Sequence, residues 1–160
     1  MKSITYGEIT FEEVCGKIKE YISQDPKAEY VISVGTDSQN IAGFTKMVSV
    51  ITLVRKSKGG IFFYDIKKIK AIKNLRQKIF METQSSVELA MELVRFIEQN
   101  HINASFEVHV DIGNNGDTKY LVKEVVGWIA GLGFRCCTKP ESYASTGIAD
   151  KISKKGSRVC

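Results

Sequence analysis

The chain has 160 residues, of which 43% are hydrophobic and 26% are charged, proportions that are ordinary for a soluble globular protein. This length leaves room for one hydrophobic core, and no apolar run approaches the roughly 20 residues of a membrane-spanning helix. Residues 1–8 also lack the apolar segment of a signal peptide. We therefore expect a single domain, 1–160, that is cytoplasmic and has no membrane partner.

The net charge of +5 and the pI of about 9.0 permit a polyanionic partner such as nucleic acid. The four cysteines include the adjacent pair Cys136 and Cys137 but no Cys-x-x-Cys spacing, and the two histidines lie far from them in the sequence. The pattern therefore predicts neither a disulfide framework nor a zinc site.

The first predicted element is a helix that begins after Thr10. Thr10 and Glu13 have the spacing of a capping box, and a proline ends the helical pattern. We interpret residues 1–28 as an N-terminal helical extension, residues 29–155 as the core of the domain and residues 156–160 as a tail.

Three strands are expected after this helix. An apolar run predicts a first strand from about Tyr30 to Asp37, a second over residues 44–55 and a third that begins at Ile61. The short turns between them indicate an antiparallel meander. An aspartate just past a buried strand lies where α/β sheets form binding crevices, although aspartate is equally common as a turn residue.

A basic stretch follows the third strand. Residues 67–78 contain six lysines and arginines and no acid. Such a run is usually a solvated face, and the alternative is a strip that contacts phosphates.

A long helix is predicted from about Asn74 to Gln99. At about 100° per residue, Glu82 lies roughly 20° from the centre of the apolar stripe, while Glu88 and Glu92 fall on the opposite side. An acid on a buried helix face is costly unless it has a partner or a role, and the alternative is a carboxylate that reaches water from the helix edge.

The last third of the chain contains two further strands. Residues 105–111 alternate apolar and polar side chains and predict a strand that ends at Asp111. Because a helix precedes it, this strand should run parallel to a strand of the meander through a right-handed crossover. A helix, a short strand over residues 134–138 and a final helix with Asp150 should follow. His109, on the same side as Asp111, could move protons or could be satisfied by a core hydrogen bond.

The order of elements, three meandering strands, helix, strand, helix, strand and helix, resembles the ribonuclease H fold over about residues 30–155. The resemblance implies an α/β fold with a five-stranded mixed sheet. In it strands one to three are antiparallel, and strands four and five run parallel to strand one. It also implies that Asp37 and Asp111 are neighbours.

Within this fold, the chain resembles the YkuK family of ribonuclease H-like proteins. Five motifs in the right order carry this resemblance: Gly35-Thr36-Asp37-Ser38-Gln39, Gly59-Gly60-Ile61-Phe62-Phe63-Tyr64, Leu75-Arg76 with Met81-Glu82, His109-Val110-Asp111-Ile112-Gly113, and Lys139-Pro140 through Tyr143-Ala144 to Ala149-Asp150.

The resemblance implies that Asp37, Glu82, Asp111 and Asp150 are catalytic residues and ligands of two divalent ions, Mg²⁺ or Mn²⁺. Asp37 would bridge both ions, Asp111 and Glu82 would share one, and Asp150 would hold the other. Two ions about 4 Å apart suit phosphodiester hydrolysis. We therefore expect a metal-dependent nuclease, a hydrolase of ester bonds that acts on RNA, DNA or a hybrid.

Two alternatives remain open in the sequence. On a helix that starts at Tyr143, Asp150 would face away from the apolar side, whereas a helix that starts near Ile148 would place it in the first turn. Glu141 and Asp117 are the alternative fourth ligands. The alternative function is a catalytically inactive module that binds nucleic acid or another protein, without metal-dependent turnover.

Overall fold

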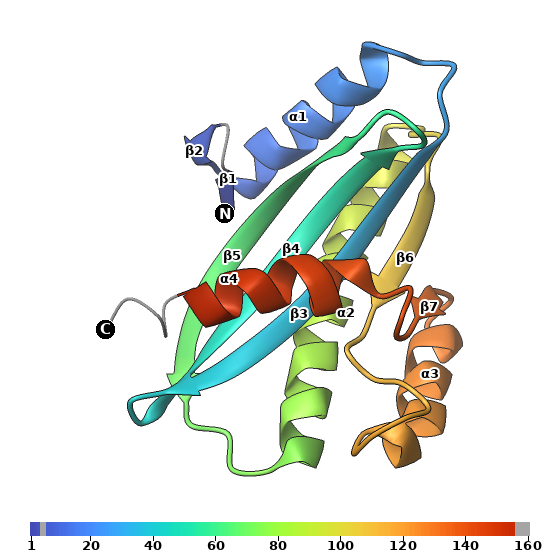
Figure 1. The fold of residues 1–160 in the computed structure, drawn as a ribbon. Coiled ribbons are helices and arrows are strands. Elements are labelled where there is room, and N and C mark those ends of the chain that lie inside the picture. Colours follow the sequence, from blue (N-terminus) through green and yellow to red (C-terminus); the bar gives the residue numbers. More distant parts are fainter. Residues whose placement is uncertain (4–5, 156–160) are drawn as a thin grey trace.

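The computed structural model describes residues 1–3 and 6–155. Within these residues, seven strands form one mixed sheet in the order β2-β1-β5-β4-β3-β6-β7, with helices on both faces (Figure 1). The elements in chain order are β1 (Lys2–Ser3), β2 (Gly7–Glu8), α1 (Phe11–Ser23), β3 (Tyr30–Ile41), β4 (Phe44–Arg55), β5 (Gly60–Lys70), α2 (Leu75–Gln99), β6 (Ser105–His109), η1 (Lys119–Leu121), α3 (Val122–Gly131), β7 (Arg135–Cys137), η2 (Tyr143–Ala149) and α4 (Asp150–Lys155).

The centre of the sheet has the predicted topology. Strands β3, β4 and β5 form an antiparallel meander, β6 pairs in parallel with β3, and β7 pairs in parallel with β6. The expectation of five strands is corrected to seven, because β1 and β2 extend the sheet beyond β5 through the pairing of Lys2 with Tyr64. Strands of two residues are too short to show an alternating pattern in the sequence.

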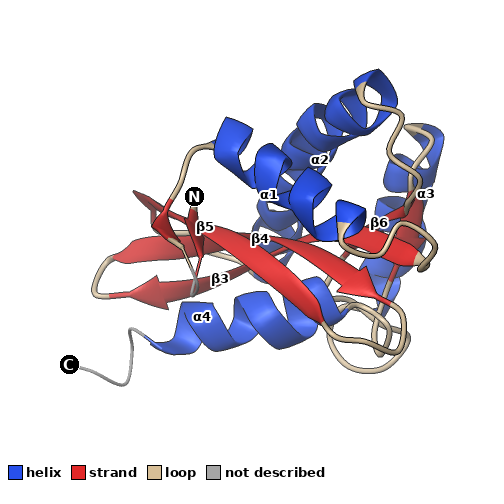
Figure 2. Ribbon diagram, turned by 90° about the horizontal axis from the view of Figure 1, so that it is seen from above, coloured by secondary structure: helices blue, strands red, loops and turns tan. Residues whose placement is uncertain are grey.

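Different helices pack on the two faces of the sheet. Figure 2 shows α1 and α2 on one side of the sheet and α4 on the other. The main hydrophobic core includes Ile18 of α1, Leu93 of α2 and Ile129 of α3, packed on the sheet residues Ile32 and Leu53. On the opposite face, Ala149 contacts a smaller apolar cluster that includes Val48 and Val50. The consecutive segments η2 and α4 therefore cover a second, smaller core.

Helix boundaries follow the capping signals in the sequence. Thr10 accepts a hydrogen bond from the Glu13 backbone N–H at 3.1 Å and begins α1, which confirms the predicted cap. Asn74 accepts from the Gln77 N–H at 2.8 Å and begins α2. The basic stretch, by contrast, divides: residues 67–70 belong to β5, and the rest leads into α2.

The segment before α4 approaches the sheet closely at Gly35. A Cβ atom at Gly35 would lie 2.5 Å from the amide nitrogen of Ser145 and 2.8 Å from the carbonyl carbon of Ala144. Real Cβ atoms do not come so near to backbone, so only glycine lets η2 rest directly on β3. This contact places the C-terminal helix against the strand that carries Asp37.

None of the helices in the described part of the chain combines the length and apolar character that crossing a membrane requires.

Candidate carboxylate site

Asp37 and Asp111 lie side by side because of the strand register. In the parallel pair β3–β6, Gly35 is the partner of His109, and each aspartate follows two residues later at the same end of the pair. Asp37 is 1% exposed, and the Asp111 side chain is 18% exposed. The fold thus brings two acids that are 74 positions apart in the sequence to one end of the strand pair, where Asp37 is buried and Asp111 is partly exposed.

Asp37 is held by contacts from two helices. The Ser153 hydroxyl on α4 donates a hydrogen bond to Asp37 Oδ2 at 2.6 Å, and the Lys78 ammonium on α2 lies 4.0 Å from Oδ1. Burial raises the pKa of Asp37, and the charges of Asp111 and Asp150 raise it further, whereas Ser153 and Lys78 oppose the shift. The pKa is raised because the loss of hydration is the largest of these effects.

Glu82 occupies the buried face of α2, as the helical periodicity predicts. Its side chain is 4% exposed, and the Ser38 hydroxyl donates a hydrogen bond to Oε2 at 3.2 Å. Burial raises the pKa of Glu82 well above its ordinary value, and the charges of Asp37 and Asp111 act in the same direction. The Lys78 ammonium opposes the rise. Glu82 and Asp111 line the same crevice, which places Glu82 beside this strand-end aspartate.

Asp111 and Asp150 form the open side of the site. The Thr146 hydroxyl donates a hydrogen bond to Asp111 Oδ1 at 3.0 Å, and the Lys139 ammonium lies 3.2 Å from the same oxygen. Asp150 Oδ1 pairs with the Lys154 ammonium at 3.0 Å, and the Asp150 side chain is 26% exposed. Four elements or their ends therefore contribute one acid each.

The helix phase at Asp150 is set by an unusual winding. Residues 143–149 form the π-helical segment η2, and α4 begins at Asp150 itself, so the acid stands in the first turn. A π-helix has more residues per turn than an α-helix, and counting 100° per residue from Tyr143 therefore misplaces Asp150. The alternatives Glu141 and Asp117 are both exposed, and Glu141 lies instead near Cys137, whose pKa its charge helps to raise.

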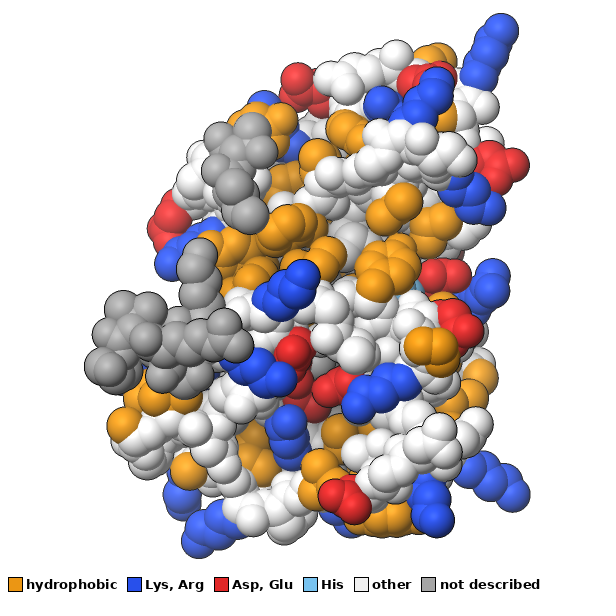
Figure 3. All heavy atoms as spheres, in the orientation of Figure 1, with side chains coloured by type: hydrophobic (Ala, Val, Ile, Leu, Met, Phe, Trp, Pro, Cys, Tyr) orange, Lys and Arg blue, Asp and Glu red, His pale blue; other side chains and the backbone are white. Residues whose placement is uncertain are grey.

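Within the described residues, no three of the four acids have carboxylate oxygens that all lie within 4.8 Å of one another. Figure 3 shows acidic side chains in a hollow near the middle of one face, with Lys and Arg side chains around it. The crevice lined by Thr36, Glu82 and Asp111 has no volume open to a water molecule. Each of the four carboxylates has a hydroxyl or ammonium partner from within the chain.

A second group of possible ligands lies beside the site. Among residues 1–3 and 6–155, one set of three has all its ligand atoms within 4.8 Å of one another: Glu107, His109 and Cys137. No spacing in the sequence indicates this group, because Cys137 and His109 are distant along the chain and meet only through the β6–β7 register.

The hydrogen bonds of His109 argue against a metal ion in this second group. Its Nδ1 accepts the Ala144 backbone N–H at 3.1 Å, and Nε2 lies 3.0 Å from Glu107 Oε1. Burial lowers the pKa of His109, so the ring is neutral and its single proton is on Nε2, where it is donated to Glu107. A metal ion at Nε2 would have to replace this proton and break the hydrogen bond to Glu107. Of the two interpretations of His109 drawn from the sequence, the structure therefore agrees with a histidine that is satisfied by core hydrogen bonds.

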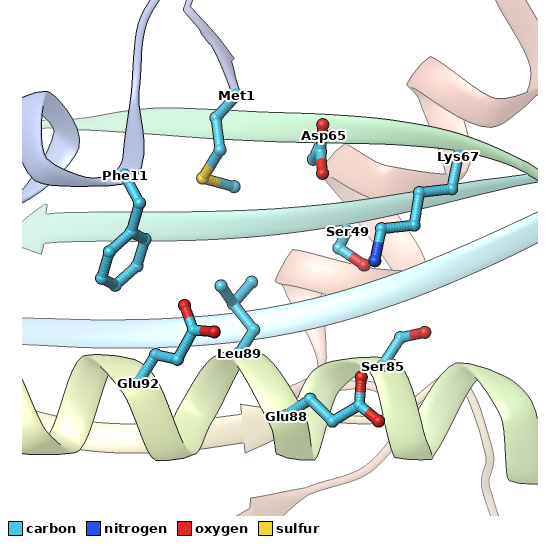
Figure 4. A pocket seen from close by; sticks show the side chains of 9 residues that line it. All are labelled: Met1, Phe11, Ser49, Asp65, Lys67, Ser85, Glu88, Leu89 and Glu92. Atoms are coloured by element: carbon cyan, nitrogen blue, oxygen red, sulfur yellow. The ribbon is translucent and has the colours of Figure 1, made fainter.

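A separate cavity lies away from the four acids. It has a volume of about 310 Å³ between α2 and the strands β4 and β5, and Figure 4 shows Glu88 and Glu92 of α2 and Asp65 and Lys67 of β5 among the side chains that line it. None of the four predicted site residues lines it. The carboxylate site is instead next to a cavity of about 410 Å³ at the start of α2, lined by Ser38, Lys73 and Lys78 among others.

The fold is that of an α/β protein of the ribonuclease H-like class. A family model described as "Ribonuclease H-like" matches residues 13–154, and the chain belongs to this family. It is also 32% identical over 164 aligned residues to the uncharacterized protein YkuK of Bacillus subtilis (strain 168), with 95% of each chain covered. The chain is therefore a YkuK homologue, as its motifs predict.

Two solved structures are similar at low sequence identity. RNase H1 from the halophilic archaeon Halobacterium salinarum NRC-1 is 15% identical with a TM-score of 0.39, and the match covers 76% of this chain and 96% of that one. Endonuclease V of Ciona intestinalis, in complex with a 24mer DNA, is 12% identical with a TM-score of 0.40, and the match covers 93% and 99%.

Proposed function

We propose that this chain is a divalent-metal-dependent nuclease that hydrolyses phosphodiester bonds in RNA, DNA or a hybrid of the two. The observation that carries the proposal is the arrival of four acids from four separate parts of the fold at one end of the β3–β6 pair. Two of these acids, Asp37 and Glu82, are buried. Burying a carboxylate is costly unless it has a partner or a role, and metal binding would give these two acids a role.

The donor set fits a hard divalent cation. Asp37, Glu82, Asp111 and Asp150 all offer carboxylate oxygens, the ligands that Mg²⁺ and Mn²⁺ prefer, and these four would hold the metal. When bound, two such ions supply stabilisation of the attacking and the leaving oxygen in a phosphodiester displacement.

The hydroxyl groups of the chain orient these acids. Ser153 occupies Oδ2 of Asp37, Ser38 occupies Oε2 of Glu82, and Thr146 occupies Oδ1 of Asp111. Each hydrogen bond holds one oxygen and limits rotation of the carboxylate. The second oxygen of each group is then directed by the fold, which is the preorganisation that a catalytic site requires.

The raised pKa values have a consequence for ion binding. Because burial raises the pKa of Asp37 and of Glu82, both groups keep a proton to a higher pH in the metal-free protein. A carboxylate must lose its proton to become a ligand, so binding of a divalent ion should release protons. The acids would therefore take the ion more readily as the pH rises.

The test is cleavage of labelled RNA, DNA and hybrid duplexes with Mg²⁺ or Mn²⁺. We expect Asp37→Asn to abolish turnover, while Asp65→Asn, on β5 in the cavity away from the four acids, retains it. Circular dichroism would verify that both variants fold. Cleavage that persists at wild-type rate in Asp37→Asn would overturn the assignment.

One observation favours a second candidate function, a catalytically inactive module that binds nucleic acid. Every site carboxylate already has an internal partner, and the crevice beside Glu82 is closed to water. This alternative predicts nucleic-acid affinity that falls steeply with salt but no metal-dependent cleavage. The cleavage assay and a binding titration at two salt concentrations distinguish the two functions.

A further inference from the structure

Three lysine ammonium groups lie within 4.0 Å of three of the four site acids. We call them the site lysines, and they come from α2, from the loop after β7 and from α4. The pairs are Lys78 with Asp37 at 4.0 Å, Lys139 with Asp111 at 3.2 Å, and Lys154 with Asp150 at 3.0 Å.

The pairs balance the charge of the site without any ion. Three acids each have an ammonium partner, and the fourth acid, Glu82, accepts a hydrogen bond from Ser38. With all of these partners in place, the site has little charge left to attract a divalent cation. An ion that binds must therefore displace one or more site lysines, since ammonium and cation compete for the same carboxylate oxygens.

The site lysines have room to move. Their side chains are 31%, 45% and 50% exposed for Lys78, Lys139 and Lys154. A lysine side chain has a flexible stem of four carbons, so a displaced ammonium group can rotate outward while the backbone stays in place. Lys78 also lines the cavity of about 410 Å³ at the start of α2, together with Lys73. A displaced ammonium remains at the edge of the site, where its best new partner is an anion.

We propose that the site lysines are exchangeable counterions: they hold the acids in the metal-free protein and become phosphate contacts when divalent ions take the acids. This inference rests on the proposed function, because it takes the acids as the metal ligands and nucleic acid as the polyanion. Metal and nucleic acid then bind with positive coupling, and by linkage each raises the affinity of the other by the same factor.

The proposal predicts opposite effects of one substitution on two ligands. Removing a site lysine should tighten metal binding in the absence of nucleic acid by about tenfold, because one competing charge within 4 Å is gone. The same substitution should weaken nucleic-acid binding and lower its salt dependence by about one phosphate contact. The coupling between the two ligands should shrink. A lysine with a purely structural role would not give this pattern.

The experiment uses the full chain and Mn²⁺ as the probe. Mn²⁺ affinity is measured by electron paramagnetic resonance, with and without a DNA strand whose phosphorothioate linkages resist cleavage. The test variant is Lys139→Met, since Lys139 lies outside the helices. The matched control is Lys58→Met, because Lys58 also pairs with an acid, Asp25, at 3.2 Å, but at the far end of the β4–β5 hairpin.

We expect Mn²⁺ to bind Lys139→Met more tightly than wild type and Lys58→Met like wild type. If wild type binds Mn²⁺ and Lys139→Met binds it with unchanged affinity, the counterion role is wrong and the proposed function stands. Mn²⁺ binding by wild type that DNA does not strengthen also overturns the coupling. If wild type binds no Mn²⁺ at all, the proposed function itself fails. Lys154→Met serves as a second variant should Lys139→Met fold poorly.

Discussion

The Ser153 hydroxyl donates a hydrogen bond to Asp37 Oδ2 at 2.6 Å, although the two residues are 116 positions apart in the chain. Both are buried, at 0% and 1% exposure. The bond joins α4 to β3 at the point where the acids meet. The helix α4 therefore contributes two groups to the candidate site: the Asp150 carboxylate and the Ser153 hydroxyl that holds Asp37.

Replacing Ser153 tests this link. Ser153→Ala removes a donor from a buried carboxylate, and we expect a loss of about 1–3 kcal/mol in the free energy of unfolding. The bond favours the charged form of Asp37, so its loss should also raise the pKa of Asp37 further and weaken Mn²⁺ binding at neutral pH. Urea unfolding and Mn²⁺ titration measure the two effects. Ser33→Ala, which also removes a buried hydroxyl but one bonded to Thr52, should cost stability alone. Equal Mn²⁺ affinities in the two variants would contradict the role of Ser153.

The contact of η2 with β3 makes a second prediction, at Gly35. Gly35→Ala places a methyl group within 3 Å of the backbone of Ser145 and Ala144, so η2 must move off the strand. We expect a loss of about 1–3 kcal/mol, measured by thermal or urea unfolding. Gly16→Ala is the matched control, because Gly16 lies in α1 with nothing within 4 Å of a new Cβ. It should stabilise the helix by about 0.5–1 kcal/mol. A Gly35→Ala protein as stable as wild type would show that η2 does not depend on this close approach.

His109, the register partner of Gly35 on β6, also positions η2. The ring accepts the Ala144 N–H, donates to Glu107 and packs edge-on against Tyr143 with centroids 4.5 Å apart. His109→Phe keeps an aromatic ring but leaves the buried Ala144 N–H unpaired, at a cost of about 1–3 kcal/mol. It also removes the hydrogen bond to Glu107, which retains Arg135 at 3.5 Å.

Urea unfolding measures this loss, and His109→Gln, which can both donate and accept, should recover part of it. His101→Asn is the control, since His101 is exposed with a φ of 50°, a conformation that asparagine tolerates. If His109→Phe is no less stable than this control, the two hydrogen bonds contribute nothing to the fold.

The raised pKa of Glu82 predicts how stability depends on pH. In the folded, metal-free protein Glu82 binds its proton more tightly than in the unfolded chain. Its contribution is therefore fully present below its ordinary pKa and is lost as the pH rises through the raised value. Glu82→Gln cannot ionise, so its melting temperature relative to wild type should rise from about pH 5 to about pH 8 in EDTA.

Comparing the two proteins at each pH cancels the opposite trend from His109, whose pKa burial lowers. Excess Mg²⁺ should reduce the difference at high pH by stabilising the ionised site of wild type. A difference that stays constant over this pH range would contradict a raised pKa at Glu82.

Much of the fold could be predicted from local patterns. The capping box at Thr10, the apolar run that ends at Asp37 and the helical periodicity that buries Glu82 are each contained within a few turns or one strand. Such signals survive because side-chain direction follows directly from the 2.0 and 3.6 residue periods. The parallel direction of β6 followed from the helix that precedes it, and its place beside β3 followed from the resemblance to the ribonuclease H fold. These local rules were enough to identify the order of elements and the three acids Asp37, Glu82 and Asp111.

The remaining features were decided by the tertiary structure. The two N-terminal strands add to the sheet only because β5 offers an open edge, and His109 meets Cys137 only through the pairing of β6 with β7. The position of Asp150 depends on the π-helical winding of η2 over Gly35, which no periodicity in the sequence reveals. The partners of the acids are equally non-local. The sequence by itself determined which acids the fold presents, because burial and strand ends are local properties. Only the folded chain determined what holds each acid, because hydrogen bonds and ion pairs form between groups that are distant in the sequence.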